Sequence, residues 1–153
     1  MFSKEEAKQL RMEFWDGFRV YTRKRRVKAG KPSWWILDRT GINALNLRLH
    51  IDREKALAGI DIETRNMDKR FALYEKLESL KKLLHQVMER EMTWELDYIR
   101  ENGKSVSRIY ISEEGLDIYN RETWSEAYRF FYRHMEKLEE FYLEYKEYIK
   151  AGT

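Results

Sequence analysis

The C-terminal region from Arg121 to Ile149 constrains the fold more than any other part of this chain. Apolar side chains recur there at steps of three and four residues, which keeps them on one face of an α-helix for about seven turns. This face comprises Trp124, Tyr128, Phe131, Met135, Leu138, Tyr142, Tyr145 and Ile149. Because Phe130, Phe141 and Tyr148 widen it, the pattern predicts a helix that covers a sheet or several helices rather than one partner helix.

A second helix is predicted at the N-terminus. Ser3 and Glu6 have the spacing of a capping box, in which each side chain binds a free backbone N–H of the first helical turn. Gly30 and Pro32 predict where this helix ends. Its buried face is predicted to consist of Ala7, Leu10, Phe14, Phe18 and Tyr21.

The hydrophobic period changes after Pro32. The segment 34–37 predicts a short strand. Apolar and polar residues alternate in 45–51 and again in 58–63, which is typical of half-buried strands. The three segments together predict an antiparallel meander with one apolar and one polar face.

A helix is predicted from Asn66, its N-cap, to about Met92, with an apolar face that includes Phe71. A hairpin follows. Asn102-Gly103 favours a two-residue type I′ turn, because both residues tolerate positive φ. Counting outward from that turn places Trp94 opposite Ile111, and Asp97 opposite Arg108 on the exposed side.

The predicted fold class is therefore α+β. We expect an antiparallel sheet of about five strands, made of a three-strand meander and a hairpin, with helices packed on one face. The expected element order is α-βββ-α-ββ-α, in a single domain of residues 1–153.

Composition limits where such a chain works. It contains no cysteine, which excludes disulfides and thiolate metal sites and predicts a reducing, cytoplasmic location. The first residues lack the apolar run of a signal peptide, and no uncharged apolar run approaches the roughly 18 residues of a membrane span. The net charge of +3 permits nucleic-acid contact without requiring it.

Several segments follow one another in an order and spacing that can be compared with known families. They are Trp34–Gly41, Leu47, Leu49, Ile60, Ile62, Phe71, Leu77, Trp94, Glu95, Ser107, Arg108, Ile109 and Trp124. Taken in this order, they resemble the bacterial domain of unknown function 4268, and the resemblance would extend from about Trp34 to Ile149. It implies a domain that occurs alone or behind a restriction-endonuclease-like nuclease domain, for which we expect no room in this chain. It implies no catalytic residue, because the family has no assigned activity.

A cluster of cations at the end of the first predicted helix is the best candidate for binding. Its members are Arg23, Lys24, Arg25, Arg26, Lys28 and Lys31. The helix dipole favours cations at this end, but six positive charges exceed what that effect requires. The cluster predicts contact with nucleic-acid phosphates or with an acidic protein. A solvated helix end, paired with Glu5 and Glu6 of a second subunit, is the alternative.

An alternative function is a metal-dependent nuclease or a nuclease accessory domain. Asp61 and Glu63 alternate on a strand, followed by Arg65, with Asp38 or Asp52 upstream as a further carboxylate. Arg65 stands where such nucleases use a lysine, and arginine cannot act as a base. No metal site is predicted, since His50, His85 and His134 have no metal-ligand spacing.

The C-terminal helix also suggests assembly. At about 40 Å it would be as long as the whole domain is wide, so its end would overhang the core. A second copy of the chain would cover the overhang, through Tyr142, Tyr145, Tyr148 and Ile149. The sequence therefore predicts a non-enzymatic binding or assembly module that forms a homodimer and uses no cofactor.

Overall fold

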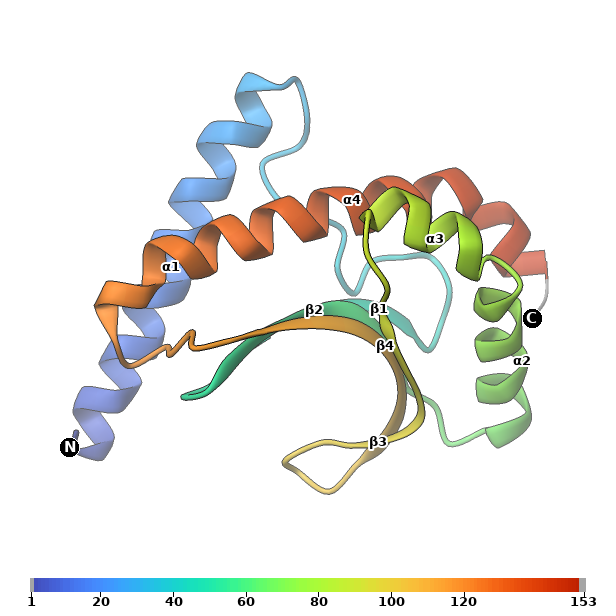
Figure 1. The fold of residues 1–153 in the computed structure, drawn as a ribbon, viewed down its shortest axis with the longest axis horizontal. Helices are drawn as coiled ribbons and strands as arrows, with labels where there is room; N and C mark the ends of the chain where they lie inside the picture. The colour runs from blue at the N-terminus through green and yellow to red at the C-terminus, as the bar shows by residue number, and fades with distance from the viewer. Residues whose placement is uncertain (1, 152–153) are drawn as a thin grey trace. The chain divides into compact units, whose positions relative to one another are not determined.

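The computed structural model describes residues 2–151. In this part of the chain four α-helices and four strands follow one another, with a 3₁₀ turn before the last helix (Figure 1). The fold class α+β is thereby confirmed. The elements are α1 (Lys4–Lys28), β1 (Leu45–Ile51), β2 (Lys55–Ile62), α2 (Met67–Glu78), α3 (Lys81–Met88), β3 (Thr93–Ile99), β4 (Ser105–Glu114), η1 (Arg121–Thr123) and α4 (Trp124–Ala151).

The strands form one antiparallel sheet in the order β1-β2-β4-β3. The two hairpins of the chain therefore meet along β2 and β4, which become the central strands. In β2 every residue after Lys55 is buried, and in β4 Val106 to Ile109 are buried. The central strands are thus covered on both faces, whereas the alternating pattern had predicted a polar face open to water.

The predicted fifth strand, 34–37, is wrong: these residues form no strand. Leu37 has φ +38°, which lies outside the β region and breaks an extended run. One ladder-like bond remains, from the Leu47 N–H to the Leu37 carbonyl at 2.9 Å. Trp35 is fully buried because its ring packs on Phe18 and on Tyr132, so its apolar character reflects this packing and not strand pairing.

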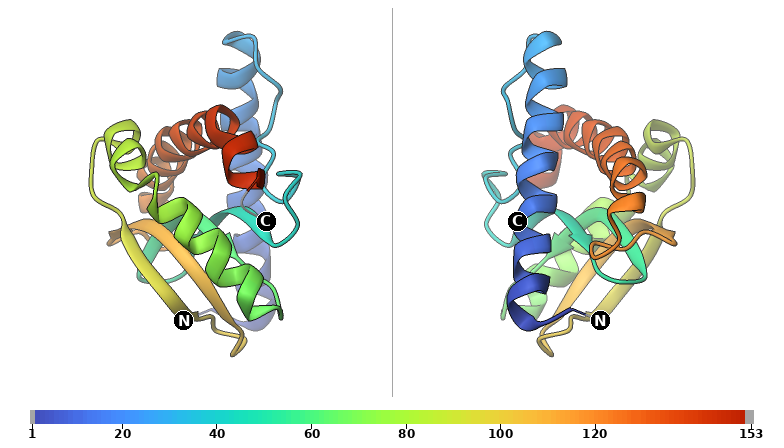
Figure 2. Two further views of the ribbon diagram at one scale, coloured as in Figure 1. Left: turned by 90° about the vertical axis from the view of Figure 1, so that its right-hand side faces the viewer. Right: turned by 90° about the vertical axis from the view of Figure 1, so that its left-hand side faces the viewer.

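The single helix predicted from Asn66 to Met92 is two helices, α2 and α3, which Figure 2 shows as separate segments. Asn66 caps α2 as predicted, accepting the Lys69 N–H at 3.1 Å. The break lies at Ser79. Its hydroxyl donates to the Lys76 carbonyl at 2.5 Å and so replaces a bond of the helical ladder.

The predicted register of the second hairpin is also wrong. Positive φ occurs at Gly103 but not at Asn102, which rules out a type I′ turn. The Arg100 N–H donates to the Lys104 carbonyl at 2.8 Å, so the loop has three residues. A β-bulge between Glu95 and Tyr98 then shifts the pairing again. As a result Trp94 pairs with Ile109, Glu95 with Arg108, and Tyr98 with Val106.

The chain separates into two compact units. One contains the residues up to Trp35, Leu49–Leu57 and Ser112–Arg133, and the other contains Ile36–Arg48, Ala58–Ile111 and the residues from His134 onward. Whether the chain behaves as one domain stays a prediction.

In the first unit, α1 packs on the first turns of α4. The capping box of Ser3 and Glu6 is present, as predicted. Phe14 and Phe18 are fully buried, and both rings contact Phe131 of α4. The Tyr128 hydroxyl donates to the Phe14 carbonyl at 2.7 Å. Aromatic contacts of this kind hold the helices together.

In the second unit, the remaining turns of α4 supply much of the core. Met135, Leu138 and Tyr142 are fully buried, which confirms the apolar face predicted for the C-terminal helix. The Tyr142 hydroxyl donates to the Thr40 carbonyl at 2.6 Å. This bond ties the loop before β1 to the helix.

Candidate functional site

The basic end of α1 divides into exposed and buried cations. Arg26 is only 2% exposed. Its Nε donates to the Pro32 carbonyl at 2.7 Å, and its guanidinium lies 5.4 Å from the ring centre of Trp35. Arg26 therefore holds the chain as it leaves the helix and presents no charge to a partner. The other five predicted residues, Arg23, Lys24, Arg25, Lys28 and Lys31, are exposed.

Most of these exposed cations have no counter-ion. Among the described residues, no carboxylate pairs with Arg23, Lys24, Arg25 or Lys28. Arg25 lies over the ring of Tyr21, at 3.5 Å from its centre, and donates to the carbonyl of the same residue. We call the five exposed residues the basic end of α1. Four of them, Arg23, Lys24, Arg25 and Lys28, have no carboxylate partner among the described residues.

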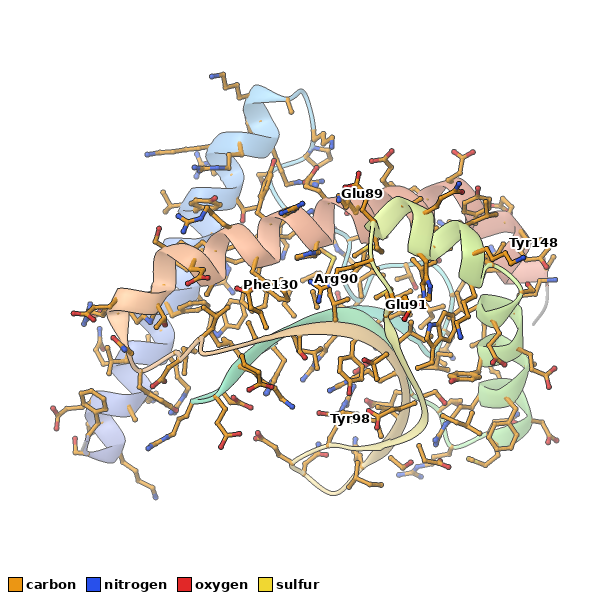
Figure 3. All side chains as sticks on the ribbon, viewed as in Figure 1. Glu89, Arg90, Glu91, Tyr98, Phe130 and Tyr148 are labelled. Carbon is orange, nitrogen blue, oxygen red and sulfur yellow. The ribbon has the colours of Figure 1, made fainter. Side chains whose placement is uncertain are left out.

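The four residues predicted to make a dimer contact are divided in the same way. Tyr142 and Ile149 are fully buried inside the second unit, so they leave no surface for a second copy. Tyr145 is half-buried, and Tyr148 is 45% exposed. Tyr148, labelled in Figure 3, lies under Lys76 of α2 and shares a 2.8 Å hydrogen bond with Ser79. Homodimerisation stays a prediction.

A network of buried charge lies on the polar face of the sheet in the second unit. Its centre is Asp61 of β2, which is fully buried. Arg108 of the neighbouring strand β4 donates to both of its carboxylate oxygens, from Nε at 2.7 Å and from Nη2 at 2.8 Å. Arg100, from the turn of the second hairpin, donates a third bond at 2.7 Å. Three charge-assisted hydrogen bonds from two arginines thus converge on this one carboxylate.

Arg100 extends the network outward. Its Nη1 also donates to Glu63, the residue that follows β2, and Lys104 lies 3.9 Å from the other oxygen of that carboxylate. The side chain of Arg100 is 12% exposed and that of Glu63 is 35% exposed. The network therefore leads from the buried Asp61 to the surface, and Arg100 links the two carboxylates.

Arg48 of β1 belongs to the same cluster but has no partner in it. Among the described residues no carboxylate, hydroxyl or carbonyl binds its guanidinium, and its Nε is buried. Desolvation lowers the pKa of Arg48, and so does the positive charge of Arg100 and Arg108, while Asp61 and Glu63 act in the opposite direction. Arg100 also keeps a buried Nε without a partner.

Two tyrosines border the arginines. The guanidinium of Arg108 lies 4.1 Å from the ring centre of Tyr98, and Tyr98 meets Tyr110 edge to face at 5.7 Å. The Tyr110 hydroxyl donates to Glu95 at 2.8 Å. Burial and this bond raise the pKa of Tyr110 to about 12. Figure 3 shows Tyr98 on the inner side of the bend that β3 and β4 make.

Arg70 of α2 holds the bulge that gives β3 its position. It is 2% exposed, and its Nη2 donates to the Leu96 carbonyl and to Asp97, both at 2.5 Å. Its Nε donates to the Ser107 hydroxyl at 2.9 Å. These bonds bind both strands at the point where the register shifts. Arg70 thereby sets which residues of β3 face Arg108.

Asp61 and Glu63, the pair on which the nuclease alternative depends, are thus both bound by arginine. The other carboxylates and the cation named with them lie elsewhere: Asp38 and Arg65 are exposed, and Asp52 accepts backbone N–H groups of the β1–β2 turn. The nuclease alternative stays a prediction. Of the histidines, His85 accepts from the indole N–H of Trp94 at 3.2 Å.

The sequence patterns did not predict that four arginines would lie together around β3 and β4. These are Arg48, Arg70, Arg100 and Arg108. A signal existed for Arg70, which continues the buried stripe of Leu73, Tyr74 and Leu77 at helical spacing. A charged residue in an apolar stripe indicates a buried partner. For the other three no local signal exists, because β1, β4 and a turn bring them together.

Comparison with known proteins adds the family. None of the curated proteins and none of the solved structures match this chain. No helix among the described residues is long and apolar enough to cross a membrane. The family model described as domain of unknown function (DUF4268) matches residues 10–146 of 153. This match includes both central strands, the charge network and most of α4, so the resemblance is confirmed and the chain belongs to the DUF4268 family.

Proposed function

We propose that the protein is a cytoplasmic, non-enzymatic binding module that contacts the phosphate backbone of nucleic acid through the basic end of α1. One observation carries the proposal. Arg23, Lys24, Arg25 and Lys28 are exposed on the last turns of one helix, and no described carboxylate pairs with any of them. Cations without intramolecular counter-ions gain most from phosphates, because binding releases the condensed counter-ions of the nucleic acid.

Because Arg26 is buried, it is not part of the proposed binding surface. Changing Arg26 would disturb the exit of α1, so a loss of binding in such a variant would have no clear cause. The exposed members are better targets because their side chains touch little else. No base-specific contact is proposed, since cations that meet phosphates position a protein without reading sequence.

The test is fluorescence anisotropy with a labelled DNA duplex and a labelled RNA strand at several salt concentrations. The variant Arg23→Gln, Lys24→Gln, Lys28→Gln should bind more weakly. Its salt slope should fall by about 0.9 for each lost phosphate contact on duplex DNA.

A matched control removes the same charge elsewhere. Arg65, Lys82 and Arg90 are exposed residues of the second unit, and their triple change to Gln leaves α1 intact. We expect the control to retain most of the affinity and the full salt slope. Equal losses in the two variants, or no binding by the wild type at low salt, would contradict the proposal.

A further inference from the structure

The charge network on the sheet is incomplete at Arg48. Every other charged group in it has a partner: Asp61 holds Arg108 and Arg100, while Glu63 holds Arg100 and lies beside Lys104. Arg48 has none among the described residues. The three arginines exceed the two carboxylates by one positive charge, and Lys104 adds a second.

The two carboxylates of the cluster are already engaged by other cations. Asp61 accepts two hydrogen bonds from Arg108 and one from Arg100. Glu63 is engaged on one oxygen by Arg100 and on the other by Lys104. Arg48 is half-buried, and a partly desolvated guanidinium beside two other guanidiniums is stabilised when an anion joins it.

Two buried donors point to where the anion would sit. The Nε atoms of Arg48 and Arg100 are both buried and both lack an acceptor. The two side chains lie close enough for their charges to repel, and each fork can offer Nε and Nη to one oxyanion. The ring of Tyr98 lies against Arg108 and borders the same cluster.

We propose that Arg48 and Arg100, supported by Arg108, bind a phosphate group of a small molecule on the polar face of the sheet. Phosphate suits the site better than a carboxylate for two reasons. Its oxygens point in several directions and can meet two guanidinium forks at once. Its charge at neutral pH, between −1.5 and −2 for a monoester, matches the excess of the three arginines and Lys104 over the two carboxylates.

This site is independent of the nucleic-acid contact proposed for α1. It is built from arginines of β1, β4 and the second hairpin, of which Arg108 is buried while Arg48 and Arg100 are half-buried. No residue of α1 takes part in it. Free inorganic phosphate is therefore the appropriate probe.

The first experiment follows the wild-type protein directly. Inorganic phosphate is titrated against chloride at matched ionic strength, and the Nε–H resonances of the arginines are observed by NMR. We expect the Nε–H signals of Arg48 and Arg100 to shift together and saturably. Phosphate that shifts other resonances but leaves these two unchanged would overturn the assignment.

The second experiment uses Arg48→Met, with Arg65→Met as an exposed control that removes the same charge. Phosphate should raise the unfolding temperature of the wild type and of the control. It should bind Arg48→Met about tenfold more weakly or not at all, as expected for the loss of a charged hydrogen-bonding partner. Without phosphate, Arg48→Met should be at least as stable as the wild type, since it removes an unpaired charge.

Three results would contradict the site. The first is that phosphate stabilises Arg48→Met as much as the control. The second is that Arg48→Met unfolds well below the wild type when no phosphate is present. The second result would give Arg48 a structural role. Acetate that binds as tightly as phosphate would overturn the phosphate assignment. The variant Arg23→Gln, Lys24→Gln, Lys28→Gln loses nucleic-acid binding only if the proposal for α1 is right. It should keep its full phosphate response in either case.

Discussion

Two arginine-rich regions of this molecule differ in almost every physical respect. The basic end of α1 lies within a short stretch of sequence and is exposed, and no described carboxylate pairs with Arg23, Lys24, Arg25 or Lys28. The network around Asp61 draws its arginines from positions 48, 100 and 108, and its centre is buried. Neighbouring cations on one helix repel unless water separates them, so this run stays at the surface except for Arg26. In the network around Asp61, β2 supplies a carboxylate to Arg108 of β4 and to Arg100 of the hairpin turn.

The largest test of this contrast is Asp61→Asn. The change keeps the shape of the side chain but leaves Arg100, Arg108 and Arg48 without their buried counter-charge. We expect a loss of about 3–5 kcal/mol in the free energy of unfolding, measured by urea denaturation. Glu63→Gln removes a carboxylate of the same network that is 35% exposed, and should cost less than about 1 kcal/mol. Similar losses in the two variants would show that burial does not separate their roles.

A smaller test compares two neighbouring arginines of α1, of which one is buried and the other is exposed. Arg26→Met removes a buried charged donor to the Pro32 carbonyl, and should cost about 1–3 kcal/mol. Arg25→Met removes an exposed cation above Tyr21, which is worth about 0.5–1 kcal/mol. Thermal unfolding of the two variants side by side measures the difference. If Arg25→Met costs as much as Arg26→Met, exposure is a poor guide at this helix end.

The smallest effect is expected at alkaline pH. The folded pKa of Tyr110 is about 12, above its ordinary value of 10.0, because of burial and the bond to Glu95. The unfolded chain therefore loses this proton first. The stabilisation is complete below pH 10.0 and is lost as the pH rises through about 12.

Tyr110→Phe removes that contribution, so its stability should decline less steeply than that of the wild type over this window. Tyr128, whose pKa burial also raises to about 12, is the matched tyrosine in the first unit. Tyr128→Phe should reduce the alkaline decline in the same way. An unchanged decline in Tyr110→Phe would remove Tyr110 from the buried network. Tyrosinate absorbance, recorded with the unfolding curves, identifies the ionising groups.

The helices were the most predictable part of the fold. The cap at Ser3, the buried face of α1 and the apolar stripe of α4 follow from periodicity and local hydrogen bonding, which the sequence displays directly. The strand 34–37 failed because Trp35 is apolar for packing against Phe18, a contact that no local pattern reveals. The prediction of one long second helix was wrong because the helical ladder is interrupted at Ser79, whose hydroxyl binds the Lys76 carbonyl.

The site was less predictable than the fold. Arg108 was expected opposite Asp97 on an exposed face, because Asn102-Gly103 indicated a two-residue turn. The longer loop and the bulge moved the partner of Arg108 from Asp97 to Glu95, a shift of two residues that does not exchange the faces of the sheet. The prediction failed in placing Arg108 on an exposed face, because Arg108 is buried against Asp61 of β2. The adjacency of β2 and β4 is a property of the whole sheet and could not be read from either hairpin alone.

The bulge held by Arg70 has a consequence for how this chain can vary. One extra residue in β3 decides whether Tyr98 lies on the same face of the sheet as Arg108. The loss or gain of a single residue in β3 would therefore move the Tyr98 ring to the opposite face. Many substitutions there would leave the arrangement intact. The length of β3 is therefore as important for the site as its residues. We expect related chains to tolerate substitutions in β3 far more readily than insertions or deletions.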